Sequence, residues 1–112
     1  MSRDIKTVFG AFMQAIEAVE GAELKGAELS SVARERIESE IRHFVGLCER
    51  EGRGRGWSDE ELGVDLWFSR NIRGTGFVIR GRHDGEWLEK MARATGTTCG
   101  AYLGEDGLIY LT

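Results

Sequence analysis

The sequence is poor in the residues that mark disulfide-rich, metal-binding and membrane-spanning proteins. It contains two cysteines, Cys48 and Cys99, which are far apart and belong to no CxxC pair. No cluster of histidine or cysteine accompanies either one, so we expect two small buried apolar residues in a reducing compartment, with no disulfide. The histidines show no HxxxH spacing either. We therefore predict no metal and no cofactor.

Long apolar runs are also missing. No stretch approaches the roughly 20 residues that span a bilayer. The N-terminal sequence MSRDIKTVFG lacks the basic, apolar and cleavage regions of a signal peptide. We therefore expect a cytoplasmic protein without membrane contact. The 112 residues are enough for one domain with a real core, and the net charge of −4 is too small to prescribe a partner.

Two amphipathic helices are predicted in the first half of the chain. Ser2 can cap a helix that runs to about Glu20. Its apolar stripe has three- and four-residue spacing and comprises Ile5, Val8, Phe9, Phe12, Ile16 and Val19. Ser30 or Ser31 can cap a second helix that ends near Glu51. Its stripe comprises Ile37, Ile41, Phe44, Val45 and Cys48. Because the connection is short, we expect the two helices to pack as an antiparallel pair.

Residues 52–56, with the sequence Gly-Arg-Gly-Arg-Gly, predict a mobile hinge, because alternating glycine and arginine favour neither helix nor strand. Ser58 and Glu61 then have the spacing of a capping box. It predicts one short helical turn that ends before Gly63. A further helix is predicted over residues 84–95, where several apolar residues share one side.

The stretch from Val64 to Gly81, VDLWFSRNIRGTGFVIRG, has the pattern of a β-hairpin. Two apolar runs flank a turn-rich centre at residues 71–74. In the first run, Val64, Leu66 and Phe68 alternate with the residues of the opposite face. Four arginines lie at or just beyond the hairpin ends, namely Arg70, Arg73, Arg80 and Arg82. The predicted hairpin has an apolar face for the core and a cationic rim for a partner.

The tail, residues 99–112, predicts a second hairpin around the turn Gly104–Gly107. We therefore expect an α+β fold, with two N-terminal amphipathic helices followed by a four-stranded antiparallel sheet of two hairpins with a helix between them. The single domain, residues 1–112, divides into a helical half (1–51), the glycine and arginine hinge (52–56) and a β-rich half (57–112).

Candidate catalytic groups are scarce. His43 lies beside the buried stripe of the second helix, where packing explains it. His83 precedes Asp84, and such a pair can tune a base, but Asp84 is equally explained as the cap of the helix that follows. We predict no catalytic residue and no enzyme.

The rim of the first hairpin is the candidate partner-binding site. It comprises Trp67, Arg70, Asn71, Arg73, Arg80 and Arg82. The polar face of an amphipathic strand does not require a tryptophan, and tryptophan with arginine is typical of hot spots in protein interfaces. Stacked bases would use the same residues. In the alternative interpretation a helix or Trp57 covers Trp67, and Asp65 pairs with Arg70 across the sheet.

Two separated segments of the chain together carry the residues of one specific sequence pattern. The first comprises Asp65, Leu66, Trp67, Ser69, Arg70, Asn71, Gly74, Gly76, Phe77, Arg80 and Gly81, and the second Tyr102 to Gly107 with Ile109, Tyr110 and Leu111. With them, residues 31–112 resemble a family of small proteins of unknown function that is frequent in phages and phage-derived bacterial islands. The family pattern reads roughly D-F-W-x-T-R-N-G-H-G-x-G-F-x-x-R-G, then Y-V-G-D-D-G-x-I-Y-L. Ile72 and Arg73 stand where the family has Gly and His.

The resemblance implies a non-enzymatic interaction protein of phage or mobile-element origin that acts in the host cytoplasm. We expect it to bind and sterically inhibit a host defence factor, such as a CRISPR effector complex, as anti-CRISPR proteins do. The alternative is a nucleic-acid-binding accessory protein, whose phosphate contacts would be Arg53, Arg55, Arg70, Arg73, Arg80 and Arg82. A homodimer closed by an exposed apolar hairpin face is a further alternative.

Overall fold

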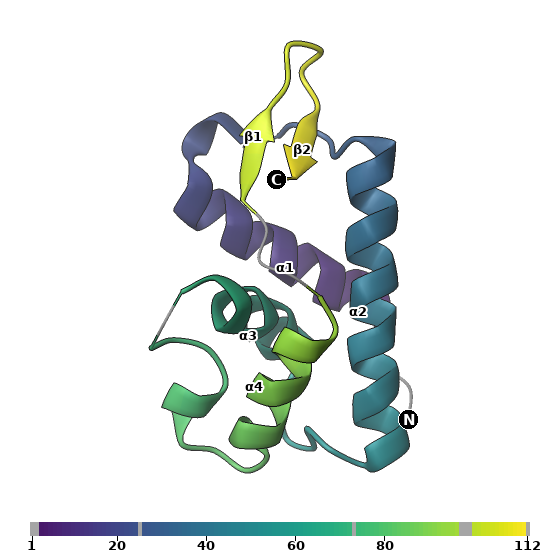
Figure 1. Cartoon of the computed structure of the whole chain (residues 1–112), viewed down its shortest axis with the longest axis vertical. Coiled ribbons are helices and arrows are strands. Elements are labelled where there is room, and N and C mark those ends of the chain that lie inside the picture. Colours follow the sequence, from purple (N-terminus) through teal and green to yellow (C-terminus); the bar gives the residue numbers. More distant parts are fainter. Residues whose placement is uncertain (1–2, 25, 73, 97–99, 112) are drawn as a thin grey trace.

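A computed structural model describes residues 3–24, 26–72, 74–96 and 100–111 (Figure 1). The helices are α1 (Ile5–Glu20), α2 (Ser31–Glu51), α3 (Asp59–Asn71) and α4 (Gly85–Ala94). Two short 3₁₀ turns are η1 (Ala22–Leu24) and η2 (Val78–Arg80). The strands are β1 (Ala101–Leu103) and β2 (Ile109–Leu111), which form one two-stranded sheet.

The predicted four-stranded sheet of two hairpins is wrong. The first run of the predicted hairpin lies in α3, and the second run forms a loop with η2. The predicted capping box of Ser58 and Glu61 is present in both directions, and three acidic residues fill the first turn. The helix then continues to Asn71 instead of ending before Gly63.

Gly63 is a contact point between helices and not the end of one. A Cβ atom at Gly63 would lie 2.3 Å from the carbonyl oxygen of Val8 and 2.8 Å from the Cβ of Ala11. The missing side chain therefore lets α3 lie directly against α1, and this is the most extensive helix contact of the fold. The predicted antiparallel pairing of the first two helices is replaced by an oblique crossing of α1 and α2 (Figure 1).

The helices predicted to end near Glu20 and Glu51 and the helix predicted over residues 84–95 are confirmed, with shifted caps. Ser30 caps α2, and its side chain accepts a hydrogen bond from the amide of Ala33. Asp4 caps α1, while Ser2 lies outside the described residues. Asp84 occupies the position before α4, but its side chain makes no cap hydrogen bond.

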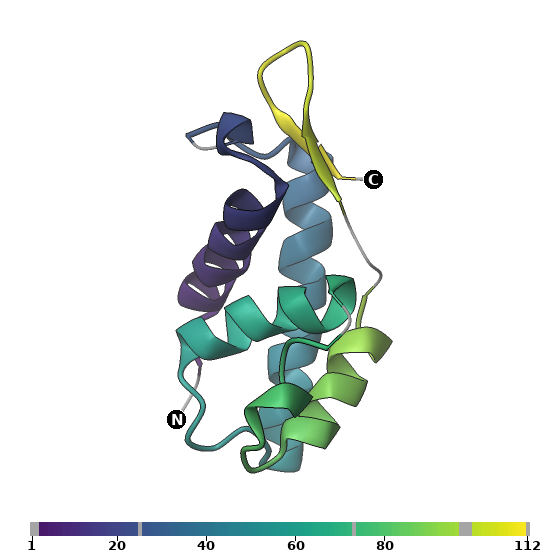
Figure 2. The same ribbon diagram turned by 90° about the vertical axis from the view of Figure 1, so that its left-hand side faces the viewer.

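The C-terminal hairpin is confirmed, and a third segment borders it. β1 and β2 pair antiparallel, with Tyr102 opposite Tyr110 and Leu103 opposite Ile109. Beyond β2, the amide of Ile109 donates to the carbonyl of Glu28, and the amide of Ser30 donates to the carbonyl of Ile109. The hairpin projects beyond the helices at one end of the molecule (Figures 1 and 2).

The core lies between α1, α2, α3 and α4. Its largest fully buried side chains include Trp67, Phe12, Phe44 and Phe77. Cys48 is buried as predicted, and burial raises the pKa of its thiol to about 12, while Cys99 lies outside the described residues. None of the helices in the described ranges is both long enough and apolar enough to cross a bilayer.

Candidate protein-binding surface

Contacts with Ser69 hold residues 76–77 in place, and the η2 turn that follows them is exposed to solvent. The hydroxyl of Ser69 accepts a hydrogen bond from the amide of Phe77 at 3.0 Å and donates one to Glu89 at 2.7 Å. A Cβ atom at Gly76 would lie 2.1 Å from that hydroxyl oxygen, and the φ of Gly76 is +93°. Only glycine fits this turn without strain.

Phe77 anchors this loop in the core. Its ring stacks on Phe44 at a centroid distance of 5.8 Å and meets the edge of Trp57 at 5.3 Å. The next two side chains point away from the core, and Val78 and Ile79 are 48% and 67% exposed. An apolar pair on an anchored turn can bury surface against a partner with little loss of backbone entropy.

Arg80 is held beside this pair by a buried carboxylate. Its Nε and Nη2 atoms donate to the two carboxylate oxygens of Asp65 at 3.0 and 2.9 Å. The Asp65 side chain is 1% exposed, whereas that of Arg80 is 48% exposed. The bidentate contact with Asp65 raises the pKa of Arg80. The guanidinium is therefore fixed in place while part of it remains open to solvent.

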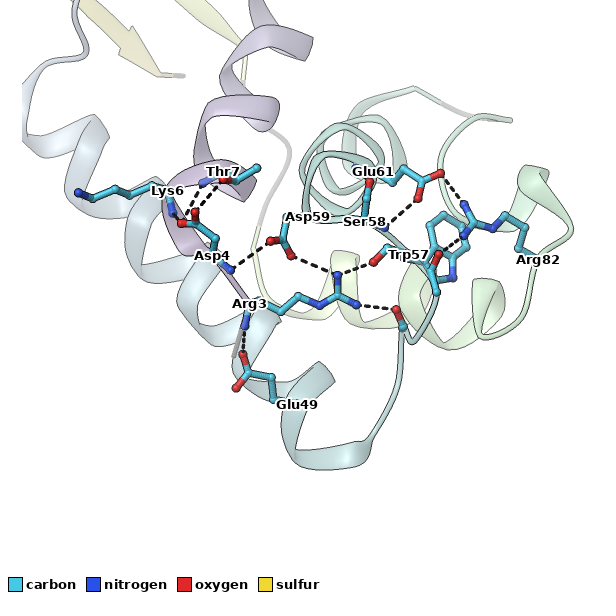
Figure 3. Close-up of polar contacts among 12 residues, drawn as sticks. Arg3, Asp4, Lys6, Thr7, Glu49, Trp57, Ser58, Asp59, Glu61 and Arg82 are labelled. Carbon is cyan, nitrogen blue, oxygen red and sulfur yellow. Dashed lines mark hydrogen bonds and ion pairs between the residues drawn. The ribbon is translucent and has the colours of Figure 1, made fainter. Parts of the chain in front are cut away.

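Arg82 is fixed in a similar way (Figure 3). It donates to the carboxylate of Glu61 and to the carbonyl oxygen of Gly56, both at 2.6 Å. Its guanidinium carbon also lies 4.0 Å from the centre of the Trp57 ring, within the range of a cation–π contact.

A hollow of about 560 Å³ lies between residue 53, the end of η2 and the start of α4. Arg53 lies over the ring of Trp87 at 5.6 Å and donates to Asp84 at 3.1 Å. The amide of Gly54 donates to the same carboxylate at 2.9 Å, and this bond is the largest cause of the lowered pKa of Asp84. We call Val78, Ile79, Arg80, Arg82 and this hollow the η2 surface.

His83 also lines the hollow, and its Nε2 atom lies 3.3 Å from Asp84. The Asp84 carboxylate is already bonded to a backbone amide and to an arginine. Among the described residues, no serine, threonine, cysteine or lysine lines the hollow. Nor do three His, Cys, Asp or Glu side chains gather as a metal site anywhere in the described ranges.

Two of the predicted rim residues, Trp67 and Arg70, face the protein interior, and a third, Asn71, is half-buried. Trp67 is 1% exposed and packs edge-to-face on Phe68. The Arg70 side chain is 1% exposed and donates to Glu40 at 2.7 Å. It also donates to the carbonyl of Ala92 and the hydroxyl of Thr95. The side chain of Asn71 donates to the carbonyl of Trp67.

The other three differ in position. Arg80 and Arg82 lie on the η2 surface, and Arg73 lies outside the described residues. Asp65 pairs with Arg80 and not with Arg70, because α3 places Asp65 opposite the returning loop. The hairpin on which the cationic rim was predicted is not formed. The exposed Arg80 and Arg82 belong instead to the η2 surface.

The predicted hinge at residues 52–56 is tied to its surroundings (Figure 3). Arg3 donates to the carbonyl oxygens of Gly54 and Trp57 and to the carboxylate of Asp59. The amide of Arg3 donates to Glu49. Sequence reasoning missed Arg3 because its partners lie about fifty residues away and no local pattern connects them.

Several residues in the first segment of the family-like pattern have structural roles. Trp67 is part of the core, and Arg70 and Arg80 form ion pairs with Glu40 and Asp65. The hydroxyl of Ser69 accepts a hydrogen bond from the amide of Phe77 and so holds the loop that follows α3. This first segment therefore forms α3 and the turn that leads to η2, and it does not by itself mark a binding site. No protein-family model, no curated protein and no solved structure matches this chain.

Proposed function

We propose that this protein is a non-enzymatic binding module that contacts a partner protein through the η2 surface. The exposed pair Val78 and Ile79 carries the proposal, because two adjacent apolar side chains on an anchored turn are exposed beside fixed arginines. Arginine and tryptophan, present here as Arg80, Arg82 and Trp87, are enriched in interface hot spots. The matching partner surface has an apolar depression edged by carboxylates or carbonyl oxygens.

The pairing of the arginines favours a protein over a nucleic acid. Arg53, Arg80 and Arg82 each contact a carboxylate at 3.1 Å or less, and Arg70 is buried. A phosphate backbone would have to compete with these carboxylates, so fewer counterions would be released on binding.

The described lining of the hollow has no serine, threonine, cysteine or lysine, and its Asp84 carboxylate is already bonded to a backbone amide and to an arginine, which favours a role in binding over catalysis. The resemblance to phage proteins suggests a host defence factor as the partner, and a CRISPR effector complex is the most concrete version. That identity stays a prediction from the resemblance.

The test is affinity capture from bacterial lysate with and without nuclease. We expect a discrete protein or complex that survives nuclease and is lost with the double variant Val78→Ser and Ile79→Ser. The matched control is Val32→Ser on α2, which removes a 75% exposed valine far from η2 and should leave capture unchanged. Capture that vanishes with nuclease would identify a nucleic-acid binder, and equal capture by the double variant would rule out the η2 surface.

A further inference from the structure

The outer edge of β1 carries backbone groups that point away from the sheet. In an antiparallel ladder, hydrogen-bonded and non-hydrogen-bonded pairs alternate. The amide of Gly104 bonds to the carbonyl of Leu108, so the next pair, Leu103 and Ile109, is non-hydrogen-bonded. Ile109 accordingly directs its amide and carbonyl outward, to Glu28 and Ser30. By the same geometry Leu103 directs its own amide and carbonyl to the opposite edge.

That edge is open in the part of the chain that the structure describes. No described residue hydrogen-bonds to the outward amide and carbonyl of Leu103, whereas the far edge of β2 is occupied by residues 28–30. Tyr102 and Leu103 are 50% and 42% exposed. The hairpin also extends beyond every helix in both views, so no helix flanks its tip (Figures 1 and 2).

The hairpin is rigid enough to act as a template for another strand. Tyr102 and Tyr110 stack at a ring distance of 5.8 Å. The hydroxyl of Tyr110 donates to Asp106 at 2.5 Å, and the amide of Leu108 donates to the same side chain at 3.0 Å. A partner strand would therefore pay little ordering cost on this side of the contact.

The described charges around this edge are acidic. Both α1 and η1 contact β1, and neither has a basic residue in its last turn. The exposed carboxylates near this end include Glu20, Glu23, Glu105 and Asp106. From residue 100 to 112 the sequence contains no lysine or arginine. An extended segment with positive side chains is therefore complementary to this edge, whereas a phosphate backbone is not.

We infer that the outer edge of β1 binds an extended basic segment of a partner protein by β-strand addition. Main-chain hydrogen bonds to Leu103 set the register, while Tyr102 and Leu103 contact apolar side chains on alternate faces. A second copy of this chain fits less well, because pairing two β1 edges would bring like-charged hairpins together. This site lies at the opposite end of the molecule from η2. The inference is therefore independent of the proposed function, and its test can fail without affecting the test of the η2 surface.

The test uses two synthetic peptides, acetylated and amidated, that alternate valine with lysine or valine with glutamate. Each is titrated into isotope-labelled protein by NMR. We expect the lysine peptide to shift the amides of residues 101–103 and to slow hydrogen exchange of the Leu103 amide by at least about tenfold. The glutamate peptide should do neither. Equal effects of both peptides, or shifts elsewhere only, would overturn the inference.

Two variants at Leu103 separate the backbone from the side chain. Leu103→Pro removes the outward amide while leaving the β1–β2 hydrogen bonds possible, and should weaken binding about fivefold to tenfold. Leu103→Ala keeps the amide and should retain more of the affinity. Unchanged affinity in the proline variant would contradict the inference. Should that variant lose the hairpin, the exchange measurement on the wild-type protein decides. Sedimentation that shows a dimer lost with Leu103→Pro would assign the edge to a second copy instead.

Discussion

The substitution Gly63→Ala tests the crossing of α1 and α3. Gly63 lies inside α3, and an added methyl group would meet the backbone of α1, with the Val8 carbonyl oxygen at 2.3 Å and the Phe12 amide nitrogen at 3.0 Å. Backbone atoms of a packed helix cannot rotate away as a flexible side chain can. The two helices must therefore separate, which loosens the layer of side chains between them.

Two opposing effects set the magnitude. Alanine is favoured over glycine in a helix interior by about 1 kcal/mol. Overpacking a buried contact typically costs about 1–3 kcal/mol, and more where backbone must move. The net of the two effects is that Gly63→Ala lowers the free energy of unfolding by about 0–2 kcal/mol, and by more where the α1 backbone must move. Gly10→Ala on α1, where nothing lies within 4 Å of the added Cβ, should instead raise it by about 0.5–1 kcal/mol.

The assay is urea denaturation followed by far-ultraviolet circular dichroism. Both variants restrict the unfolded chain equally, so the difference between them reports on the folded crossing. Gly46→Ala on α2 is a second control, because its Cβ also meets nothing within 4 Å. If Gly63→Ala stabilises the protein as Gly10→Ala does, α3 does not lie against α1 and the described fold is wrong.

Three further predictions concern buried and titrating groups. Arg70→Ala should lower the free energy of unfolding by about 1–3 kcal/mol in urea denaturation, because the carbonyl of Ala92 loses its buried donor while Glu40 keeps Arg36 as a partner; an unchanged free energy of unfolding would contradict the buried contact. In a Cys99→Ser background, Cys48 should resist iodoacetamide at about pH 8 and react once urea unfolds the protein, since burial raises its pKa to about 12; rapid native labelling would refute its burial. The Gly54 amide lowers the pKa of Asp84 below its ordinary 3.8. Asp84 therefore stabilises the fold above that value and loses this contribution as the pH falls through the lowered pKa. Asp84→Asn should flatten the dependence of unfolding free energy on pH below about 4, and an unchanged slope would contradict the assignment.

Local signals predicted the elements that depend on local interactions. The period of α2 and its serine cap are readable because one face of that helix is exposed. The C-terminal hairpin is readable because its strands and turn are adjacent in sequence. The capping box of α3 was also recognised, since both of its residues lie within four positions.

The body of α3 could not be recognised from periodicity. Seven of its thirteen residues are buried, and they include Gly63, Asp65, Ser69 and Arg70. A helix that is buried on several sides lacks a clear polar face, and its β-branched and aromatic residues then suggest alternation instead. The buried side chains of Asp65, Ser69 and Arg70 each bond to a partner at least eight residues away.

The structure places the residues of the predicted rim elsewhere for the same reason. Trp67 and Arg70 are residue types typical of an interface, but the helix directs both inward. There Arg70 donates hydrogen bonds to the carboxylate of Glu40 and to the carbonyl of Ala92 in α4. Arg80 remained at the surface because only its carboxylate partner is buried. The exposure of Val78 and Ile79 follows from the anchoring of Phe77, which no local pattern reveals.

The most direct test of this account is an NMR assignment of residues 59–81, with ¹³C chemical shifts and nuclear Overhauser contacts. The described fold predicts helical shifts from Asp59 to Asn71, contacts between Gly63 and Val8, and a buried indole at Trp67. Strand shifts over residues 64–70 with cross-strand contacts to residues 75–81 would contradict it. That result would restore the hairpin rim and remove the basis for the η2 surface.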